Sequence, residues 1–401
     1  MDGIEDHFDV CIIGGSIAGN YLCYLLSKIN LKILVIEEHK DIGYPLQCAG
    51  IVSQKLRKLI ELPKEIILNR VNTAKIISPS GEYIKLSGTE RPYIINRIAL
   101  DRLYYEKVKD LNNVSYYFEE KFKSFKYIIE NGRILLLIET SKRKVKSRLL
   151  VGCDGPLSTV GKILRVRNKI LYASQIRIKN KFDQDEAAMY FNPKWKELFG
   201  WIVPEGNNIF RIGLASSKQV NTNFKIFIKS LRLDDSQVID KQGGLIPYGM
   251  MNKVAFDNIL LLGDSACQVK ATTGGGIILL LISAKYAANC IIKCFKNDIF
   301  SKKYIRKHYG KPCASIVGKE LKIHYIIRSF LENLTDKDFK NLFKIIKTTK
   351  IEHLISFYGD MDFPRTIVLK LLKNPLVFSF LLRYLLKNPK FFIRYLKMLK
   401  V

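Results

Sequence analysis

The sequence predicts an α/β protein that combines a split Rossmann-type domain with a β-rich second domain and a helical C-terminal region. Three observations predict this fold class. A buried apolar run at 8–13 leads into a glycine-rich turn and a helix. Residues 70–90 and 115–150 alternate apolar and polar positions as antiparallel strands do, and residues 170–250 are β-rich with frequent turn signals. From about residue 301 the chain has helical periodicity up to its end.

The first of these segments opens a βαβ unit, the strand–helix–strand arrangement that builds parallel sheets. Its elements are expected at 8–13, 17–29 and 31–37. A helix at 97–111, a buried strand at 259–262 and a helix at 276–295 are expected in the same domain. The nucleotide-binding domain is therefore predicted to be discontinuous, with segments 1–70, 95–165 and 255–300. The β-rich substrate domain comprises 71–94 and 166–254, and the helical region comprises 301–401.

Composition and charge narrow the class of protein. The hydrophobic fraction is 48%, which excludes a disordered chain. With 66 Lys plus Arg against 37 Asp plus Glu, the formal net charge of +29 favours anionic partners. The eight cysteines have no zinc or iron–sulfur spacing, so we expect no metal and a reducing, cytoplasmic compartment. No signal peptide is expected, and Lys285 interrupts the longest apolar run before transmembrane length.

A nucleotide-binding turn is predicted between the first strand and the first helix. It consists of Gly14, Gly15, Ser16, Ile17, Ala18 and Gly19. Such a turn points backbone N–H groups and a helix N-terminus at a pyrophosphate, although Ser16 replaces the middle glycine of the usual pattern. Glu37, followed by Glu38, ends the second strand, where an acid is expected to hold ribose hydroxyls. The alternative, a glycine-rich turn without a ligand, is disfavoured by this strand context.

A second polar segment favours FAD over NAD as the nucleotide. Asp264 follows the strand at 259–262, and a run of glycines opens the next helix: Gly274, Gly275, Gly276 and then Ile277. FAD has a ribityl chain and an isoalloxazine ring to be held besides its pyrophosphate. Asp264 is expected to accept hydrogen bonds from hydroxyl groups, and the glycines to let the backbone approach the ring. Arg97, in Asn96-Arg97-x3-Asp101, is also expected to bind the cofactor.

This series of motifs resembles the flavoprotein superfamily that includes aromatic hydroxylases. Within it, residues 8–300 look most like the geranylgeranyl reductase family, including its archaeal digeranylgeranylglycerophospholipid reductases. Three segments carry the resemblance: Gly43-Tyr44-Pro45-Leu46-Gln47-Cys48-Ala49-Gly50, Phe199-Gly200-Trp201-Ile202-Val203-Pro204, and Gly243-Gly244-Leu245-Ile246-Pro247. The chain departs from the family pattern at Phe199, Val203, Cys267 and Ala271. The first two departures concern the exact isoprenoid substrate and leave the FAD motifs intact.

The resemblance implies an FAD-dependent reductase that saturates isolated C=C bonds of geranylgeranyl or polyprenyl lipid precursors. The substrate would be geranylgeranyl diphosphate or a geranylgeranylated glycerophospholipid. Such a double bond is unactivated, so hydride transfer needs a proton donor, a dry apolar tunnel and aromatic faces. Cys48, Tyr44 and Trp201 are the candidate catalytic residues, with Cys48 and Ala49 also near the cofactor. The candidate substrate-binding residues are Gly50, Phe199, Trp201, Val203 and Pro204.

Two kinds of partner are expected, an electron donor and a membrane surface. It contains one dinucleotide fingerprint, so electrons are expected from an external donor, NAD(P)H or ferredoxin. Near the C-terminus, Lys390, Arg394, Lys397 and Lys400 share one helical face, and no acid follows residue 362. This basic amphipathic helix is expected to bind an anionic membrane surface, which predicts a peripheral location on the inner face. The alternative is that this helix packs on the protein core and that its basic face is simply exposed to solvent.

Two other functions are compatible with the sequence. The first is a flavin monooxygenase or epoxidase of the same fold, against which the segment from Pro45 to Gly50 argues. The second is a basic lipid- or nucleic-acid-binding protein with a relic nucleotide fold. Because the basic residues are spread along the chain without a nucleic-acid motif, no nucleic acid partner is expected.

Overall fold

The computed structural model describes residues 6–88, 90–389 and 391. They form two compact units, each assembled from distant parts of the chain. Unit 1 comprises Met1–Leu68, Ile95–Leu171 and Gly244–Leu321. Unit 2 comprises Asn69–Ile94, Tyr172–Gly243 and Lys322–Val401. The basic residues Lys390, Arg394, Lys397 and Lys400, on which the predicted membrane helix depends, lie outside the described residues.

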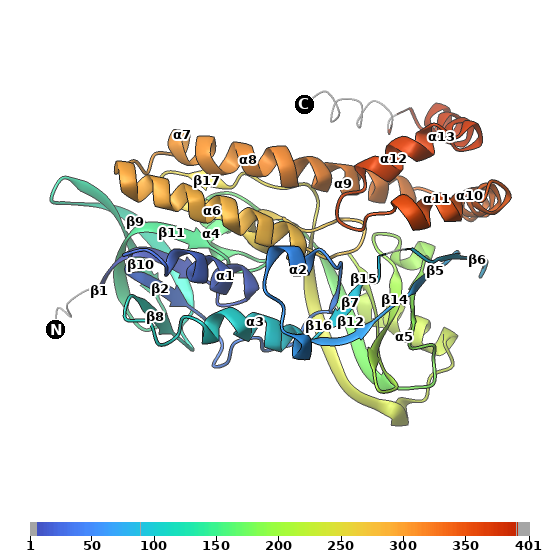
Figure 1. The fold of residues 1–401 in the computed structure, drawn as a ribbon, viewed down its shortest axis with the longest axis horizontal. Helices are drawn as coiled ribbons and strands as arrows, with labels where there is room; N and C mark the ends of the chain where they lie inside the picture. The colour runs from blue at the N-terminus through green and yellow to red at the C-terminus, as the bar shows by residue number, and fades with distance from the viewer. Residues whose placement is uncertain (1–5, 89, 390, 392–401) are drawn as a thin grey trace. The chain divides into compact units, whose positions relative to one another are not determined.

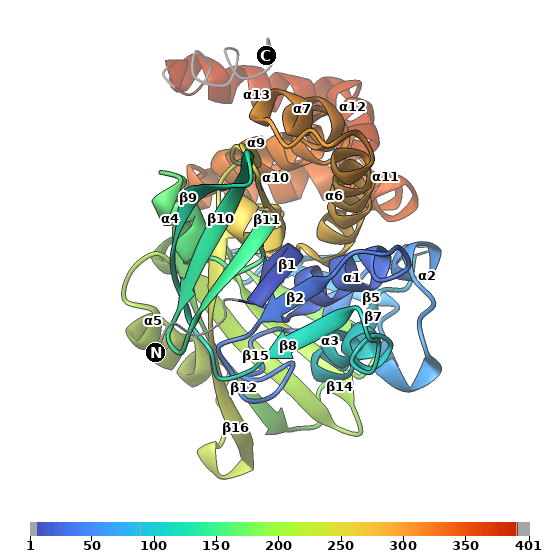
Figure 2. The same cartoon turned by 90° about the vertical axis from the view of Figure 1, so that its left-hand side faces the viewer.

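Unit 1 is built on an eight-stranded sheet with a parallel centre (Figure 2). The parallel strands run in the order β18 (Ile259–Leu261), β11 (Lys144–Gly152), β1 (Asp6–Ile13), β2 (Ile33–Ile36) and β8 (Val114–Tyr117). Antiparallel strands β9 (Phe122–Glu130), β10 (Arg133–Thr140) and β17 (Ala255–Phe256) complete the sheet. β1 and β2 are central strands because their apolar side chains are buried on both faces.

Helices cover this sheet. The first helix, α1 (Ile17–Leu26), contacts α3 (Arg97–Glu106) and α6 (Ile277–Asn297) (Figure 1). By length and composition α6 could cross a membrane, although the sequence predicted that Lys285 would end its apolar run before transmembrane length. However, 67% of the apolar segment of this helix is buried, as in the core helix of a soluble protein. The remaining short elements are β3 (Ile51–Val52), α2 (Leu56–Leu59), β4 (Ile67–Arg70), β7 (Tyr93–Ile95) and α4 (Thr159–Ile163).

Unit 2 contains a seven-stranded sheet. Its order is β16 (Val238–Tyr248), β12 (Lys169–Lys179), β15 (Ile209–Ser216), β14 (Gly200–Gly206), β13 (Glu186–Tyr190), β5 (Thr73–Ile77) and β6 (Tyr83–Leu86). On one face Ile176, Ile202 and Ile212 form a core with Phe227 of α5 (Val220–Ser230), a helix that the sequence did not predict. The other face carries the motif residue Trp201, and it is described below.

The predicted helical region is helical, but its residues divide between both units at Leu321. A continuous helical run from Lys302 to Glu332 includes two π-helical segments, at Arg306–Gly310 and Ala314–Gly318. Pro312 lies between them and has no N–H for the helical ladder, which accounts for a local irregularity. Shorter helices follow: α10 (Asp336–Thr348), α11 (Ile351–Tyr358), α12 (Arg365–Leu372) and α13 (Pro375–Lys387). The side chain of Asn374 caps α13.

Candidate active site

The turn after β1 has no room for side chains at two of its glycines. Gly14 has a φ of +102°, and a Cβ there would lie 2.4 Å from the carbonyl oxygen of Cys153 at the end of β11. A Cβ on Gly19 would lie 2.0 Å from the carbonyl oxygen of Gly14. The turn is therefore held against its own helix and the neighbouring strand, which leaves its outer side as bare backbone at the N-terminus of α1.

Glu37 fixes the same turn from the end of β2. Its carboxylate accepts hydrogen bonds from the Gly15 N–H at 2.7 Å and from the His39 N–H at 3.0 Å. Glu38 instead lies half exposed, 3.2 Å from Lys121. Ser16 begins α1 without a side-chain capping bond. The predicted pair of Gly15 and Glu37 is thus brought into direct contact at the strand end.

Arg97 lies at the centre of the predicted redox part of unit 1. Its Nη2 donates to the two carboxylate oxygens of Asp101 at 3.1 and 3.2 Å. Although burial by itself lowers the pKa of Arg97, Asp101 and Cys48 beside it raise that pKa above its ordinary value. Its Nε is buried without a hydrogen-bond partner in the described part of the chain. Asp101 was missed as a site residue, although its i,i+4 spacing from Arg97 was a signal.

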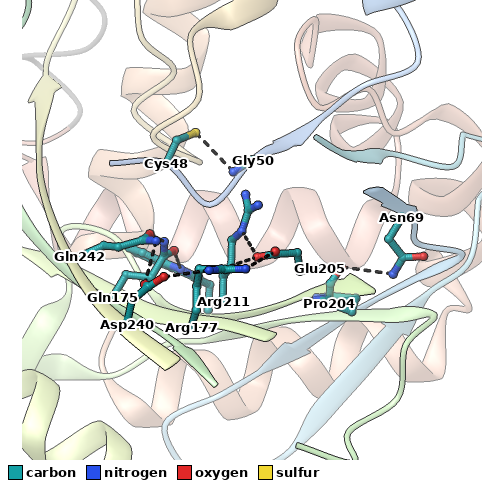
Figure 3. Close-up of polar contacts among 11 residues, drawn as sticks. Cys48, Gly50, Asn69, Gln175, Arg177, Pro204, Glu205, Arg211, Asp240 and Gln242 are labelled. Carbon is teal, nitrogen blue, oxygen red and sulfur yellow. Dashed lines mark hydrogen bonds and ion pairs between the residues drawn. The ribbon is translucent and has the colours of Figure 1, made fainter. Parts of the chain in front are cut away.

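Cys48 and Asp264 are the other ionisable groups near this guanidinium. The Gly50 N–H donates to Cys48 Sγ at 3.3 Å, and Gly50 needs its positive φ of +76° for this loop (Figure 3). Burial raises the pKa of Asp264 to about 6, and Arg97 partly offsets this shift. A Cβ on Gly263 would contact Ala18 Cβ at 3.2 Å, so the loop that carries Asp264 packs on α1. Tyr44, in contrast, is half exposed beside Arg102.

The predicted glycine run forms the start of α6. Gly274 has a φ of +72°, and Gly276 is the N-cap residue, directly before Ile277. A Cβ on Gly276 would lie 2.9 Å from the carbonyl oxygen of Gln268. The helix therefore begins with bare backbone, as the sequence predicted. The polar segment after β18 and this N-terminus belong to one loop, 262–276.

These residues fit FAD. The two close-packed glycines offer backbone to a pyrophosphate, and Glu37 stands where ribose hydroxyls are expected. The buried, unpartnered Nε of Arg97 and the desolvated carboxyl of Asp264 are polar groups that a bound ligand can satisfy. When bound, FAD would be held by these groups and by the start of α6.

The affinity for FAD is expected to rise from about pH 5 to about pH 7. Burial raises the pKa of Asp264 to about 6, so the carboxyl is protonated below that pH without the cofactor. Hydroxyl groups that donate to Asp264 favour its ionised form, and each unit by which they lower the pKa corresponds to about tenfold in affinity. Flavin fluorescence titrations measure this. The Asp264→Asn protein should bind FAD without this pH dependence, and an unaltered pH profile would exclude Asp264 as its source.

In unit 2 the predicted substrate residues lie on or next to β14. Trp201 and Val203 point to the face opposite the α5 core, because Ile202 belongs to that core. A Cβ on Gly213 of the neighbouring strand would lie 2.5 Å from Trp201 Cζ2, so the indole covers this glycine. Phe199 is buried, with its ring centroid 5.9 Å from that of Phe191. The carbonyl oxygen of Pro204 accepts from Asn69 at 3.1 Å.

A chain of hydrogen bonds crosses the Trp201 face of this sheet (Figure 3). Trp201 Nε1 donates to Gln175 Oε1 at 2.8 Å, and Gln175 Nε2 donates to Gln242 Oε1 at 2.6 Å. Gln242 Nε2 then donates to Asp240 Oδ1 at 3.0 Å. The carboxylate of Asp240 thus fixes both amide orientations, and with them the acceptor that Trp201 uses.

Two arginines complete this chain. Arg177 donates to Asp240 at 2.8 Å and to both oxygens of Glu205 at 2.6 and 2.9 Å, while Arg211 Nε donates to Glu205 at 2.8 Å. Burial alone would raise the pKa of Glu205, but the two guanidinium groups hold it below its ordinary value. Sequence reasoning missed this network because its members lie on four strands, and only β14 carried a recognised motif.

Comparisons with known proteins show which family this chain belongs to and which proteins it resembles. Residues 7–212, about half of the chain, match the family described as FAD binding domain. The chain belongs to this FAD-binding family. The flavoprotein is 30% identical to an uncharacterized protein of Methanocaldococcus jannaschii, across 92% of this chain and 96% of that protein. It is 27% identical to digeranylgeranylglycerophospholipid reductase 1 of Methanococcoides burtonii, across 86% of this chain and 88% of that protein.

The fold agrees with these relationships. A geranylgeranyl bacteriochlorophyll reductase-like protein from Thermoplasma acidophilum superposes with a TM-score of 0.80 at 21% identity, covering 94% of this chain and 99% of the other. The predicted resemblance to the geranylgeranyl reductase family and the predicted fold class are both confirmed. FAD is therefore the cofactor of this flavoprotein, which is an oxidoreductase.

Proposed function

We propose that this flavoprotein reduces isolated C=C bonds in the geranylgeranyl chains of a lipid precursor. The substrate is a geranylgeranylated glycerophospholipid or geranylgeranyl diphosphate. The name of the relative from Methanococcoides burtonii, which is matched along most of both chains, supports this substrate class. Reduced FAD, when bound, supplies the hydride for one carbon of the double bond. The other carbon must receive a proton, so the protein has to provide a proton donor as well as a binding site.

The cluster around Arg97 is the observation that carries this proposal. Its members are the thiol of Cys48, the carboxyl of Asp264 and a buried guanidinium, all at residues that were predicted for the redox end of the cofactor site. Cys48 is proposed to deliver the proton or to position the chain for it, with Gly50 and Ala49 shaping the same loop. Tyr44 is a second candidate for proton relay.

Unit 2 is proposed to supply the binding site for the isoprenoid chain. Trp201 offers an aromatic face that stabilises positive character on a substituted carbon. Phe199 and Val203 would line the same site, whereas Pro204 alternates with Val203 along β14 and therefore points to the α5 face. FAD has to be reduced again after each turnover, and we propose that NAD(P)H or ferredoxin binds transiently for this purpose, in the cytoplasm.

The test is anaerobic single-turnover kinetics. Flavin reduced with dithionite should be reoxidised by a detergent-dispersed geranylgeranyl glycerophospholipid, with one double bond lost for each flavin. The Cys48→Ala protein should keep its flavin and react at least about tenfold more slowly, because general acid catalysis contributes that much or more. The monooxygenase alternative is supported instead if the lipid gains oxygen in air and reduced flavin persists with lipid under argon.

A further inference from the structure

Helix α13 is apolar on both of its sides. One side, with Val377 and Tyr384, packs into a core together with Phe339 and Phe343 of α10. The other side carries Phe378, Leu382 and Leu386, spaced one turn apart, with 53%, 46% and 73% of their surfaces exposed. A surface helix of a soluble domain normally has a polar outer face. This exposed apolar stripe therefore needs a partner.

Helix α12, which precedes α13 in unit 2 (Figure 1), also exposes leucines. Leu369 and Leu372 are 53% and 41% exposed. The charges on these two helices have one sign, since the chain contains no Asp or Glu after residue 362. Five basic residues lie on or next to the described helices: Arg365, Lys370, Lys373, Arg383 and Lys387. Arg383 and Lys387 each follow an exposed leucine directly, so cations flank the α13 stripe along its length.

We propose that the outer faces of α12 and α13 dock on an anionic lipid surface. Apolar side chains bordered by lysine and arginine match the acyl boundary and the headgroups of such a surface. A second copy of this chain fits less well, because pairing these faces would bring cations against cations without any acid between them. The inference rests on the proposed function, since it gives the place at which an enzyme for lipid substrates would meet the membrane.

The experiment is vesicle flotation of the full-length flavoprotein. Vesicles of phosphatidylcholine alone are compared with vesicles of equal parts phosphatidylcholine and phosphatidylglycerol. The wild-type protein should float with the anionic vesicles, and high salt should weaken this binding without abolishing it. The Leu382→Asn/Leu386→Asn protein should bind at least about tenfold more weakly at both salt concentrations. The Arg383→Gln/Lys387→Gln protein should lose binding mainly at low salt.

A matched control comes from unit 1. Ile129 and Ile134 face each other across the β9–β10 hairpin and are 80% and 55% exposed. The Ile129→Asn/Ile134→Asn protein should float like the wild type. Equal loss of binding in this control, or unchanged binding of the leucine variant, would overturn the proposal. Sedimentation velocity without vesicles is the second measurement. A wild-type dimer that the leucine variant converts to monomer would assign the stripe to a second copy and also overturn it.

The reductase proposal and the membrane-docking proposal are tested by separate measurements. Reoxidation of reduced flavin by the detergent-dispersed lipid needs no vesicle, so it tests the proposed function alone. The leucine variant should keep the wild-type rate in detergent while it loses flotation. A wild-type protein that reacts in detergent but does not float would contradict the docking surface and leave the reductase proposal standing.

Discussion

A Gly14→Ala protein is expected to be purified with less than about a tenth of the wild-type flavin. The added methyl group would lie 2.4 Å from the carbonyl oxygen of Cys153, in a residue whose φ is +102°. Overpacking of this kind costs about 1–3 kcal/mol and is relieved only if the backbone shifts. A shift at Gly14 moves the amide groups that are predicted to face the pyrophosphate, so the loss should appear first in cofactor affinity.

Gly132 provides the matched control for this prediction. It also has a positive φ, +75°, but a Cβ there would meet nothing within 4 Å. Gly132→Ala therefore carries the backbone cost of about 1 kcal/mol without the collision, and it should keep its flavin. Absorbance at the flavin band and circular dichroism separate cofactor loss from unfolding. If Gly14→Ala does not fold, Glu37→Gln should still lower FAD affinity in a folded protein. A folded Gly14→Ala protein with full flavin would contradict this account of the turn.

A Gly213→Ala substitution is expected to slow flavin reoxidation by the lipid about a hundredfold, with flavin content unchanged. Its methyl group would lie 2.5 Å from Trp201 Cζ2 and 2.7 Å from the carbonyl oxygen of Ser174 on β12, so both the indole and the backbone of the neighbouring strand would have to shift. The hydrogen bond from Trp201 to Gln175 would be lost with that movement. A displacement of about 1 Å in a positioning group can lower a rate by about a hundredfold. Oxygen should reoxidise the flavin at the wild-type rate, because that reaction needs no lipid site.

Gly243→Ala in the same sheet is the control, since a Cβ there would lie 3.7 Å from its nearest neighbour, the carbonyl oxygen of Ala173. The chain has two tryptophans, so a Trp195→Phe background makes Trp201 the sole indole emitter. Its emission should shift to longer wavelength in Gly213→Ala as the indole gains contact with water. Wild-type lipid kinetics together with shifted emission would show that Trp201 belongs to the core and not to the substrate site.

The nucleotide half of the site was predictable because its signals are local. Gly14, Gly19 and Glu37 lie within one βαβ unit, where strand order and spacing determine which backbone atoms meet. The position of Asp264 in the fold could also be predicted, because it follows a buried strand directly. Element ends were less predictable: α1 ends at Leu26 and α3 at Glu106, each a few residues before the expected position.

The network behind Trp201 could not be predicted in this way. Its members come from β12, β14, β15 and β16, and their contacts depend on strand order and register, which no local pattern specifies. Helix α5 could not be predicted from the sequence for a related reason. Its sequence contains β-branched and aromatic residues, and only packing against Ile176 and Ile212 makes it helical. The helical residues after 301 were recognised, but their division between two units depends on tertiary contacts alone.

The interleaving of the two units has a consequence during synthesis. The chain leaves unit 1 at Leu68 and again at Leu171, and it returns to complete that unit only from Gly244 onward. At about 5–20 residues per second, the turn at Gly14 waits roughly 10–50 s for Asp264 to emerge from the ribosome. Until β18 arrives, residues 150–152 of β11, beyond its pairing with β10, lack a partner on that edge and can recruit other strands. Flavin loading must therefore await synthesis of the chain up to about residue 277, and a nascent chain stalled before that residue would be a client for chaperones.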